Sequence, residues 1–174
     1  MHPTAATDLG HRPARFSRYI DQAGEGDLHA LLADGAALGR RIDLGRFAVR
    51  VGHAYAPGKW TAGGVLQHIV DTERIFAYRA LRIARGDRTP LPGFDENDFA
   101  AAAARALRPA DDLLREFAAV RAASCALFAG LDRPALLARG SCSGIEIGAA
   151  ALGFAIVGHC RHHLAVLAER YLAG

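Results

Sequence analysis

Apolar residues recur along much of this chain at intervals of three and four, which is the spacing of one face of an α-helix. Four segments carry this pattern, at residues 27–42, 61–85, 109–131 and 143–170. β-Branched residues are few and do not alternate with polar residues over useful lengths, so strand signals are weak. In the last segment the spacings alternate between four and three, which is typical of a helix packed in a bundle. The pattern therefore predicts an all-α fold, a single four-helix bundle.

Capping residues mark the ends of these predicted helices. Asp27 and Thr61 suit the N-cap of the first and second helices, because their side-chain oxygens can accept a hydrogen bond from a backbone N–H. Gly86 suits a left-handed exit from the second helix, and Pro109 suits the first turn of the third. Residues 143–146, Ser-Gly-Ile-Glu, fit a capping box and predict that the fourth helix opens at its serine.

The remaining segments are expected to connect or precede the bundle. Residues 86–108 begin as a polar loop, and the alanine tract at 100–104 suits a helical connection because alanine is a strong helix former. Residues 1–26 carry charges and prolines, so we expect a loosely packed N-terminal extension. No internal repeat or linker divides the sequence, and residues 1–174 are expected to form one domain.

Composition narrows the class of protein and its partners. Hydrophobic residues make up 51% of the chain and charged residues 22%, as in ordinary globular domains. The net charge of +3 is mild and no basic block stands out, so a nucleic-acid partner is not expected. Residues 1–16 hold no apolar signal-peptide core, and the apolar run at 147–158 is too short to span a membrane. With three cysteines, an odd number, we expect free thiols in a cytoplasmic protein without a membrane partner.

Three of the 8 histidines occupy positions that the helical pattern assigns to the interior. His159 and His163 are four residues apart on the fourth helix, so their Cβ atoms lie about 5–6 Å apart on one face and both imidazoles can reach one metal ion. His68 lies mid-way along the second helix between apolar Val65 and Ile75, and is the best candidate for a third ligand. Three protein ligands with an open position are typical of catalytic zinc.

A simpler interpretation stays open beside this one. Chance often places two histidines four residues apart, and a histidine on an apolar face is commonly a hydrogen-bonded core residue. Two neutral imidazoles buried side by side nevertheless need polar partners, and a metal ion would be one. This makes a metal site as well supported as a pair of hydrogen-bonded core histidines. Cys160, next to His159, could supply a soft fourth ligand, although a small buried hydrophobe is the simpler explanation.

Two acidic residues follow His68 along the same helix. Asp71 and Glu73 could orient imidazoles from a second shell, and Glu73 is the nearest candidate for a general base. The alternative is ordinary ion pairing on the helix surface, for instance with Arg74 or Arg79.

Several motifs resemble a known family. They are YAPGKW at residues 55–60, HIVDTER at 68–74, FAYRALR at 76–82, LPGFDE at 91–96 and GHCRHHL at 158–164. Together they resemble the DinB-like (YfiT-like) superfamily of small bacterial four-helix metalloproteins, specifically its damage-inducible DinB branch. The resemblance covers roughly residues 27–172.

The resemblance implies a fold and a metal site. It implies an up-down-down-up bundle with a long connection between the second and third helices, and a homodimer. It implies one divalent metal ion, zinc or nickel before manganese or cobalt, held by His68, His159 and His163. Relatives often carry an acidic residue at the position of Cys160, so this chain lacks that candidate for a base.

Three functions follow as hypotheses. The first is a metal-dependent enzyme acting on a small molecule, a thiol S-transferase that joins a low-molecular-weight thiol to an electrophile, because a metal held by three neutral histidines lowers the pKa of a bound thiol. The second is a metal-dependent hydrolase in which the metal activates water and Glu73 serves as base. The third is a non-enzymatic metal- or ligand-binding protein of a stress response. No Ser-His-Asp arrangement, phosphate-binding loop or dinucleotide fingerprint competes with these hypotheses.

Overall fold

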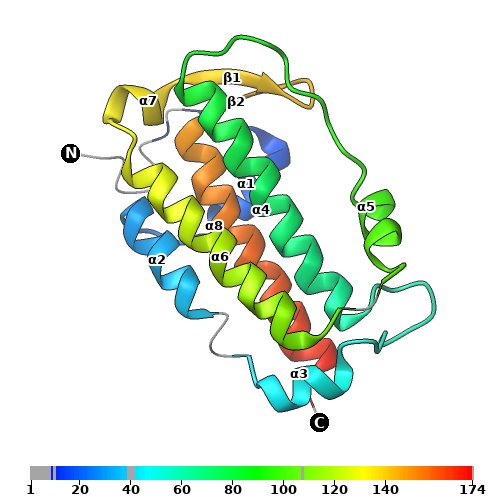
Figure 1. The fold of residues 1–174 in the computed structure, drawn as a ribbon. Helices are drawn as coiled ribbons and strands as arrows, with labels where there is room; N and C mark the ends of the chain where they lie inside the picture. Colours follow the sequence, from blue (N-terminus) through cyan, green and yellow to red (C-terminus); the bar gives the residue numbers. More distant parts are fainter. Residues whose placement is uncertain (1–8, 10, 39–41, 107, 174) are drawn as a thin grey trace.

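The computed structural model describes residues 9, 11–38, 42–106 and 108–173. Helices dominate these residues, with one short hairpin (Figure 1). The elements are α1 (Ala14–Gln22), α2 (Leu28–Leu38), α3 (Leu44–Arg50), α4 (Ala62–Ala84), α5 (Glu96–Ala103), α6 (Ala110–Ala129), α7 (Arg133–Leu137), β1 (Arg139–Cys142), β2 (Ile145–Gly148), α8 (Ala149–Val166) and a π-helical turn η3 (Leu167–Tyr171).

The long helices form a four-helix bundle, as the sequence predicts. In Figure 1, α4 and α6 run in one direction and α2 and α8 in the other, which is the up-down-down-up arrangement. Because α4 and α6 are parallel, the chain must return along the full length of the bundle between them, and this return contains α5. The alanine tract of this connection is helical, as its composition predicts.

Three of the predicted caps lie at helix boundaries. The side chain of Thr61 accepts a hydrogen bond from the backbone N–H of Gly64 at 3.0 Å, and α4 ends just before Gly86, whose φ is +80°. Asp27 likewise accepts from the backbone N–H of Ala30 at 3.0 Å. The first predicted helix corresponds to α2 as far as Leu38, and its expected last residue, Ile42, is not helical; residues 39–41 lie outside the described part of the chain.

The predicted capping box at residues 143–146 is wrong. Ser143 and Gly144 have φ of +53° and +74° and form the two-residue turn of a hairpin in which Cys142 pairs with Ile145. Glu146 lies in β2, and α8 begins after Gly148. Strands of four residues are too short to show a clear alternation, which is why the sequence pattern did not reveal them.

The expected loosely packed N-terminal extension is wrong for residues 14–22. These residues form α1, which packs along α8 and buries Phe16 and Ile20. Every residue of α8 from Ala149 to Cys160 is buried, so this helix needs neighbours on all sides and α1 supplies one of them. Residues 1–8 and 10 of the predicted extension lie outside the described part.

The same burial bears on membrane insertion. Within the described residues, one continuous helical stretch, Ala149–Tyr171, is long and apolar enough to cross a membrane, and 67% of its most apolar window is buried inside the protein. A core helix of a bundle has this composition without any membrane.

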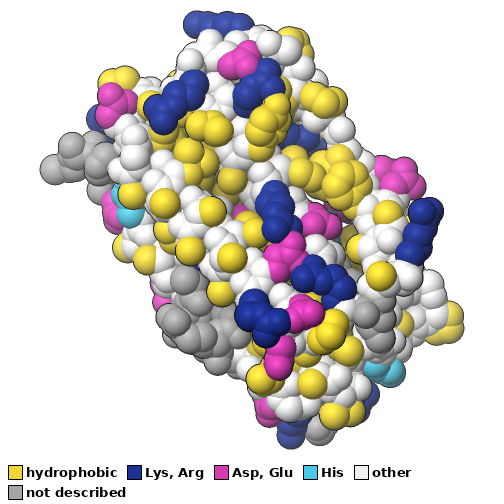
Figure 2. All heavy atoms as spheres, viewed as in Figure 1, with side chains coloured by type: hydrophobic (Ala, Val, Ile, Leu, Met, Phe, Trp, Pro, Cys, Tyr) yellow, Lys and Arg dark blue, Asp and Glu magenta, His cyan; other side chains and the backbone are white. Residues whose placement is uncertain are grey.

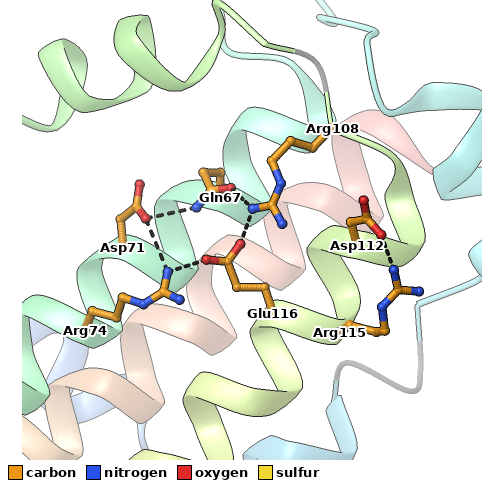
Figure 3. Close-up of polar contacts among 7 residues, drawn as sticks. All are labelled: Gln67, Asp71, Arg74, Arg108, Asp112, Arg115 and Glu116. Carbon is orange, nitrogen blue, oxygen red and sulfur yellow. Dashed lines mark hydrogen bonds and ion pairs between the residues drawn. The ribbon is translucent and has the colours of Figure 1, made fainter.

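A polar network links the parallel helices α4 and α6 (Figure 3). Glu116 on α6 accepts hydrogen bonds from Arg74 on α4 and from Arg108 just before α6. Arg108 also donates to Gln67 at 3.0 Å, and Gln67 donates to Asp71 at 2.9 Å. In Figure 2, basic and acidic side chains gather in a mixed band across this face of the molecule. The network holds the two helices together where their contact reaches solvent.

Candidate metal centre

Three histidines from two helices converge in the bundle. His68 on α4 and His159 and His163 on α8 each offer a nitrogen atom, and these atoms all lie within 4.8 Å of one another. The Nε2 atoms of His68 and His159 are 2.9 Å apart, and the centroids of the three rings are separated by 4.5–4.7 Å. His68 and His159 are buried, and His163 is half-buried. The three histidines that the sequence singles out are thus neighbours in space.

Burial sets the protonation state of these rings. It lowers the pKa of His68 to about 4 and that of His163 to about 3, and in His163 the neighbouring His68 adds to the effect. The pKa of His159 is well below its ordinary value for the same reasons. All three imidazoles are therefore neutral at pH 7, which is the form that binds a metal ion.

The nitrogen atoms all lie within 4.8 Å of one another and can reach the separations of a tetrahedral metal site once the rings move. Two imidazoles bound to zinc at 2.0–2.1 Å place their nitrogen atoms about 3.3 Å apart. The 2.9 Å between His68 and His159 is shorter than this by a few tenths of an ångström, which a slight ring movement supplies. The other ring nitrogen of His68, Nδ1, lies 3.5 Å from the hydroxyl of Thr72. This hydroxyl is placed to orient the His68 ring. Three neutral nitrogen donors suit zinc, nickel or cobalt.

Two pockets touch the histidine cluster. One has a volume of about 100 Å³ and touches His68 and His159, and the other has a volume of about 280 Å³ and touches His163. The first residues of α5 contribute to both, since Glu96 lines the smaller pocket and Asn97 the larger. A small molecule in either pocket would lie beside the imidazoles.

A family model decides the classification. The model of the DinB superfamily matches residues 8–167. The chain belongs to the DinB superfamily. The resemblance found in the sequence motifs is thereby confirmed.

A solved structure has a similar fold. The DinB-superfamily chain is similar to YfiT from Bacillus subtilis, a probable metal-dependent hydrolase with an unusual four-helix bundle topology. The TM-score is 0.63 at 14% sequence identity, over 91% of this chain and 87% of that one. At this identity the likeness concerns the fold alone. No curated protein matches the sequence.

In this DinB-superfamily protein, Glu73 is engaged in a buried ion pair. Both its carboxylate oxygens accept hydrogen bonds from Arg121 on α6, from Nε at 2.8 Å and from Nη2 at 2.7 Å. Gly35 on α2 makes room for the guanidinium, since a Cβ atom there would lie 1.8 Å from Nη1 of Arg121. A carboxylate held in this way is poorly placed to accept a proton from substrate, which argues against Glu73 as general base. Its partner is neither of the nearby arginines that the sequence suggested.

Cys160, the candidate fourth ligand, and Asp71, the candidate for orienting an imidazole, are also outside the cluster. Cys160 is fully buried, and burial raises the pKa of its thiol to about 11, so it stays protonated and behaves as a small core residue. Asp71 accepts from Gln67 and lies 3.9 Å from Arg74, which is the surface pairing considered above. Among the described residues, the group of potential metal ligands consists of the three histidines and includes neither Cys160 nor Asp71.

Sequence reasoning missed the contribution of α1 to this site. The ring of Tyr19 meets the ring of His159 edge-on with 5.1 Å between centroids. The signal was present, because Phe16, Ile20 and Ala23 follow the same four-and-three spacing as the longer helices and are all buried. A stretch of nine helical residues among charges and prolines was too short to stand out.

Proposed function

We propose that this protein is a metal-dependent enzyme acting on small molecules, with His68, His159 and His163 as ligands of one divalent cation. The observation that supports this most is the convergence of three neutral imidazoles beside two pockets. Within the described residues no carboxylate belongs to the cluster, so an ion held there keeps its double positive charge. When bound, the cation supplies the Lewis acidity that lowers the pKa of a thiol or a water toward neutral pH.

The reaction we favour transfers a low-molecular-weight thiol to an electrophile. The thiolate sulfur forms a bond to an electrophilic carbon, the leaving group departs with the electrons of its bond to that carbon, and the thiol proton passes to solvent. This chemistry needs a thiol of lowered pKa and no carboxylate base to activate water. It suits a site in which Glu73 is already held by Arg121.

Metal-dependent hydrolysis is the second candidate. It is favoured by Glu96, whose side chain lines the pocket that touches His68 and His159. A carboxylate in that position can accept the proton of an attacking water. YfiT, whose fold is similar, is a probable metal-dependent hydrolase. Thiol dependence of the turnover separates the two reactions.

The metal site is tested first, by measuring the metal content of the purified protein by mass spectrometry. The natural chain is expected to hold about one equivalent of a divalent metal, and His163→Gln is expected to lose most of it. His162→Gln is the matched control, because it removes a neighbouring histidine outside the three-ligand group. Equal metal content in the natural chain and in His163→Gln would contradict the assignment.

The reaction is tested next, with the metal-loaded protein and two substrates. A low-molecular-weight thiol plus 1-chloro-2,4-dinitrobenzene reports S-transfer through the absorbance of the thioether. A p-nitrophenyl ester without thiol reports hydrolysis. If turnover survives complete removal of the metal by a chelator, neither reaction depends on the metal and the proposal is rejected. The homodimer and the identity of the metal, zinc or nickel, stay predictions of the resemblance. The cytoplasmic location stays a prediction from the cysteines and the N-terminal sequence.

A further inference from the structure

The smaller pocket beside the histidine cluster contains two arginines. Arg79 from α4 and Arg15 from α1 line it together with His68 and His159. The turn of the hairpin and the segment before α5 close its other sides, so distant parts of the chain build it. Its volume of about 100 Å³ is below the about 300–1,000 Å³ of pockets that enclose drug-sized ligands, and suits one small polar group.

The guanidinium of Arg79 is held in a fixed position. Its side chain is only 3% exposed, and Nη2 donates hydrogen bonds to the carbonyl oxygen of Pro92 at 2.7 Å and to the hydroxyl of Ser143 at 3.2 Å. Its central carbon lies 5.9 Å from the ring centroid of Phe76 and 5.8 Å from that of Phe94. These contacts orient a cation without neutralising it.

No carboxylate of the described residues lies within ion-pairing distance of Arg79 or Arg15. Arg121, the other buried arginine among the described residues, differs in this respect because it donates two hydrogen bonds to Glu73. A buried guanidinium stays charged, and an uncompensated buried charge is costly, so such a group is rarely retained without an anion to bind. Burial lowers the pKa of Arg79, which is the expected mark of this cost.

The charges that face the pocket leave it positive. Arg79 from α4 and Arg15 from α1 contribute two positive charges, and Glu96 at the start of α5 contributes one negative charge. An anionic group is therefore attracted to the pocket. Because Nη2 of Arg79 already donates to Pro92 and Ser143, its Nη1 and Nε groups are the donors left for a carboxylate oxygen.

We propose that this pocket binds the carboxylate of a small anionic substrate, with Arg79 as the principal donor and Arg15 as the second. The carboxylate end lies at the guanidinium groups while the other end reaches the histidine cluster. The inference rests on the proposed function, because the far end of the ligand meets a metal held by His68 and His159. Both arginines are binding residues, without a part in bond making.

The test compares three small thiols of similar size and different charge, bound to the zinc-loaded full chain and measured by titration calorimetry. Mercaptoacetate carries a carboxylate, 2-mercaptoethanol is neutral and cysteamine carries an ammonium group. Mercaptoacetate is expected to bind about tenfold to a hundredfold more tightly than either of the others. Equal affinities for the three thiols would overturn the proposal.

Arginine variants test which side chains cause the preference for mercaptoacetate. Arg79→Met keeps most of the length of the side chain and is expected to reduce the preference for mercaptoacetate to within about twofold, with the affinity for 2-mercaptoethanol unchanged. Arg85→Met, which removes an exposed arginine at the end of the same helix, is the matched control and should keep the full preference. If Arg79→Met does not fold, Arg15→Gln at an exposed position provides the same comparison with a smaller loss. An unchanged preference in the folded arginine variants would overturn the assignment.

A metal-free arm separates this proposal from the proposed function. Propionate has a carboxylate and no thiol, and its binding is measured on protein treated with a chelator, so that no metal contributes to it. It is expected to bind the natural chain at millimolar concentration and to bind Arg79→Met at least about tenfold more weakly. A chain that takes up no zinc but binds propionate in this manner contradicts the metal centre and supports the anion pocket. If the natural chain takes up zinc but binds propionate no more tightly than Arg79→Met does, the result supports the metal centre and contradicts the anion pocket.

Discussion

A Cβ atom on Gly158 would lie 1.7 Å from the backbone carbonyl oxygen of Tyr19, so α1 and α8 pack backbone against backbone at this point. Glycine is required here for close approach, since any side chain would push the two helices apart. The contact lies next to His159 and brings the ring of Tyr19 against it. The position of α1 at the candidate metal centre therefore depends on the absence of a side chain one residue before a predicted ligand.

Gly158→Ala is expected to destabilise the protein by about 3 kcal/mol, because backbone atoms rather than a flexible side chain block the added methyl group. The free energy of unfolding in urea measures the effect. Gly130→Ala is the matched control, since its Cβ atom would meet neighbours at ordinary distances of 3.5 and 3.6 Å. Similar losses in the two variants would show that the backbone approach is not the cause.

Removing one partner of the buried pair between Glu73 and Arg121 is expected to cost about 3–5 kcal/mol, because the other charge is left buried and unpaired. Glu73→Leu and Arg121→Met test this by urea denaturation. The double variant is expected to lose clearly less than the sum of the two single losses. Strict additivity would mean that the two side chains do not stabilise each other.

The same double variant tests whether Glu73 is a catalytic base. Because its carboxylate is committed to Arg121, we expect the folded double variant to bind metal and to turn over substrate within a few-fold of the natural chain. A general base contributes about 10²–10⁴-fold to the rate. A loss of that size at normal metal content would restore Glu73 to the base role.

The metal-free protein is expected to lose stability as the pH falls from about 6.5 to about 4. In this window the unfolded chain binds protons on histidines of ordinary pKa, whereas folded His68 and His163 stay neutral because their pKa values are about 4 and 3. The unfolded state thus binds more protons, and the free energy of unfolding rises with pH by about 1.4 kcal/mol per unit for each excess proton. Thermal unfolding in the presence of a chelator, across this pH range, measures the slope. The double variant His68→Gln/His163→Gln should show a flatter profile, and a slope equal to that of the natural chain would refute the explanation.

Glu116→Gln is expected to cost about 1 kcal/mol, because Glu116 links Arg74 and Arg108 across α4 and α6 while the network remains partly solvated. Asp112→Asn is the matched control, since its pair with Arg115 is exposed and within one helix. The loss at Glu116 should shrink in high salt. A loss that does not depend on salt would indicate packing and not charge as its source.

Local patterns in the sequence determined the long helices and the histidine candidates. The caps at Thr61 and Gly86 act through the nearest backbone groups, so α4 could be placed from the residues at its ends. The four-residue spacing of His159 and His163 is likewise a property of one helix. Interactions that reach only a few residues along the chain leave their mark in the order of residue types.

Tertiary structure alone decided which partners these side chains meet. Arg121 and Glu73 are 48 residues apart, and nothing in either local pattern indicates that α4 and α6 bring them together. The pocket of Arg79 and Arg15 depends on α1, whose packing requires a glycine on α8, and on a hairpin too short to predict. Helix periodicity is local, whereas pairing of buried charges and the shape of a pocket arise from the packing of distant segments, which follows from the whole bundle.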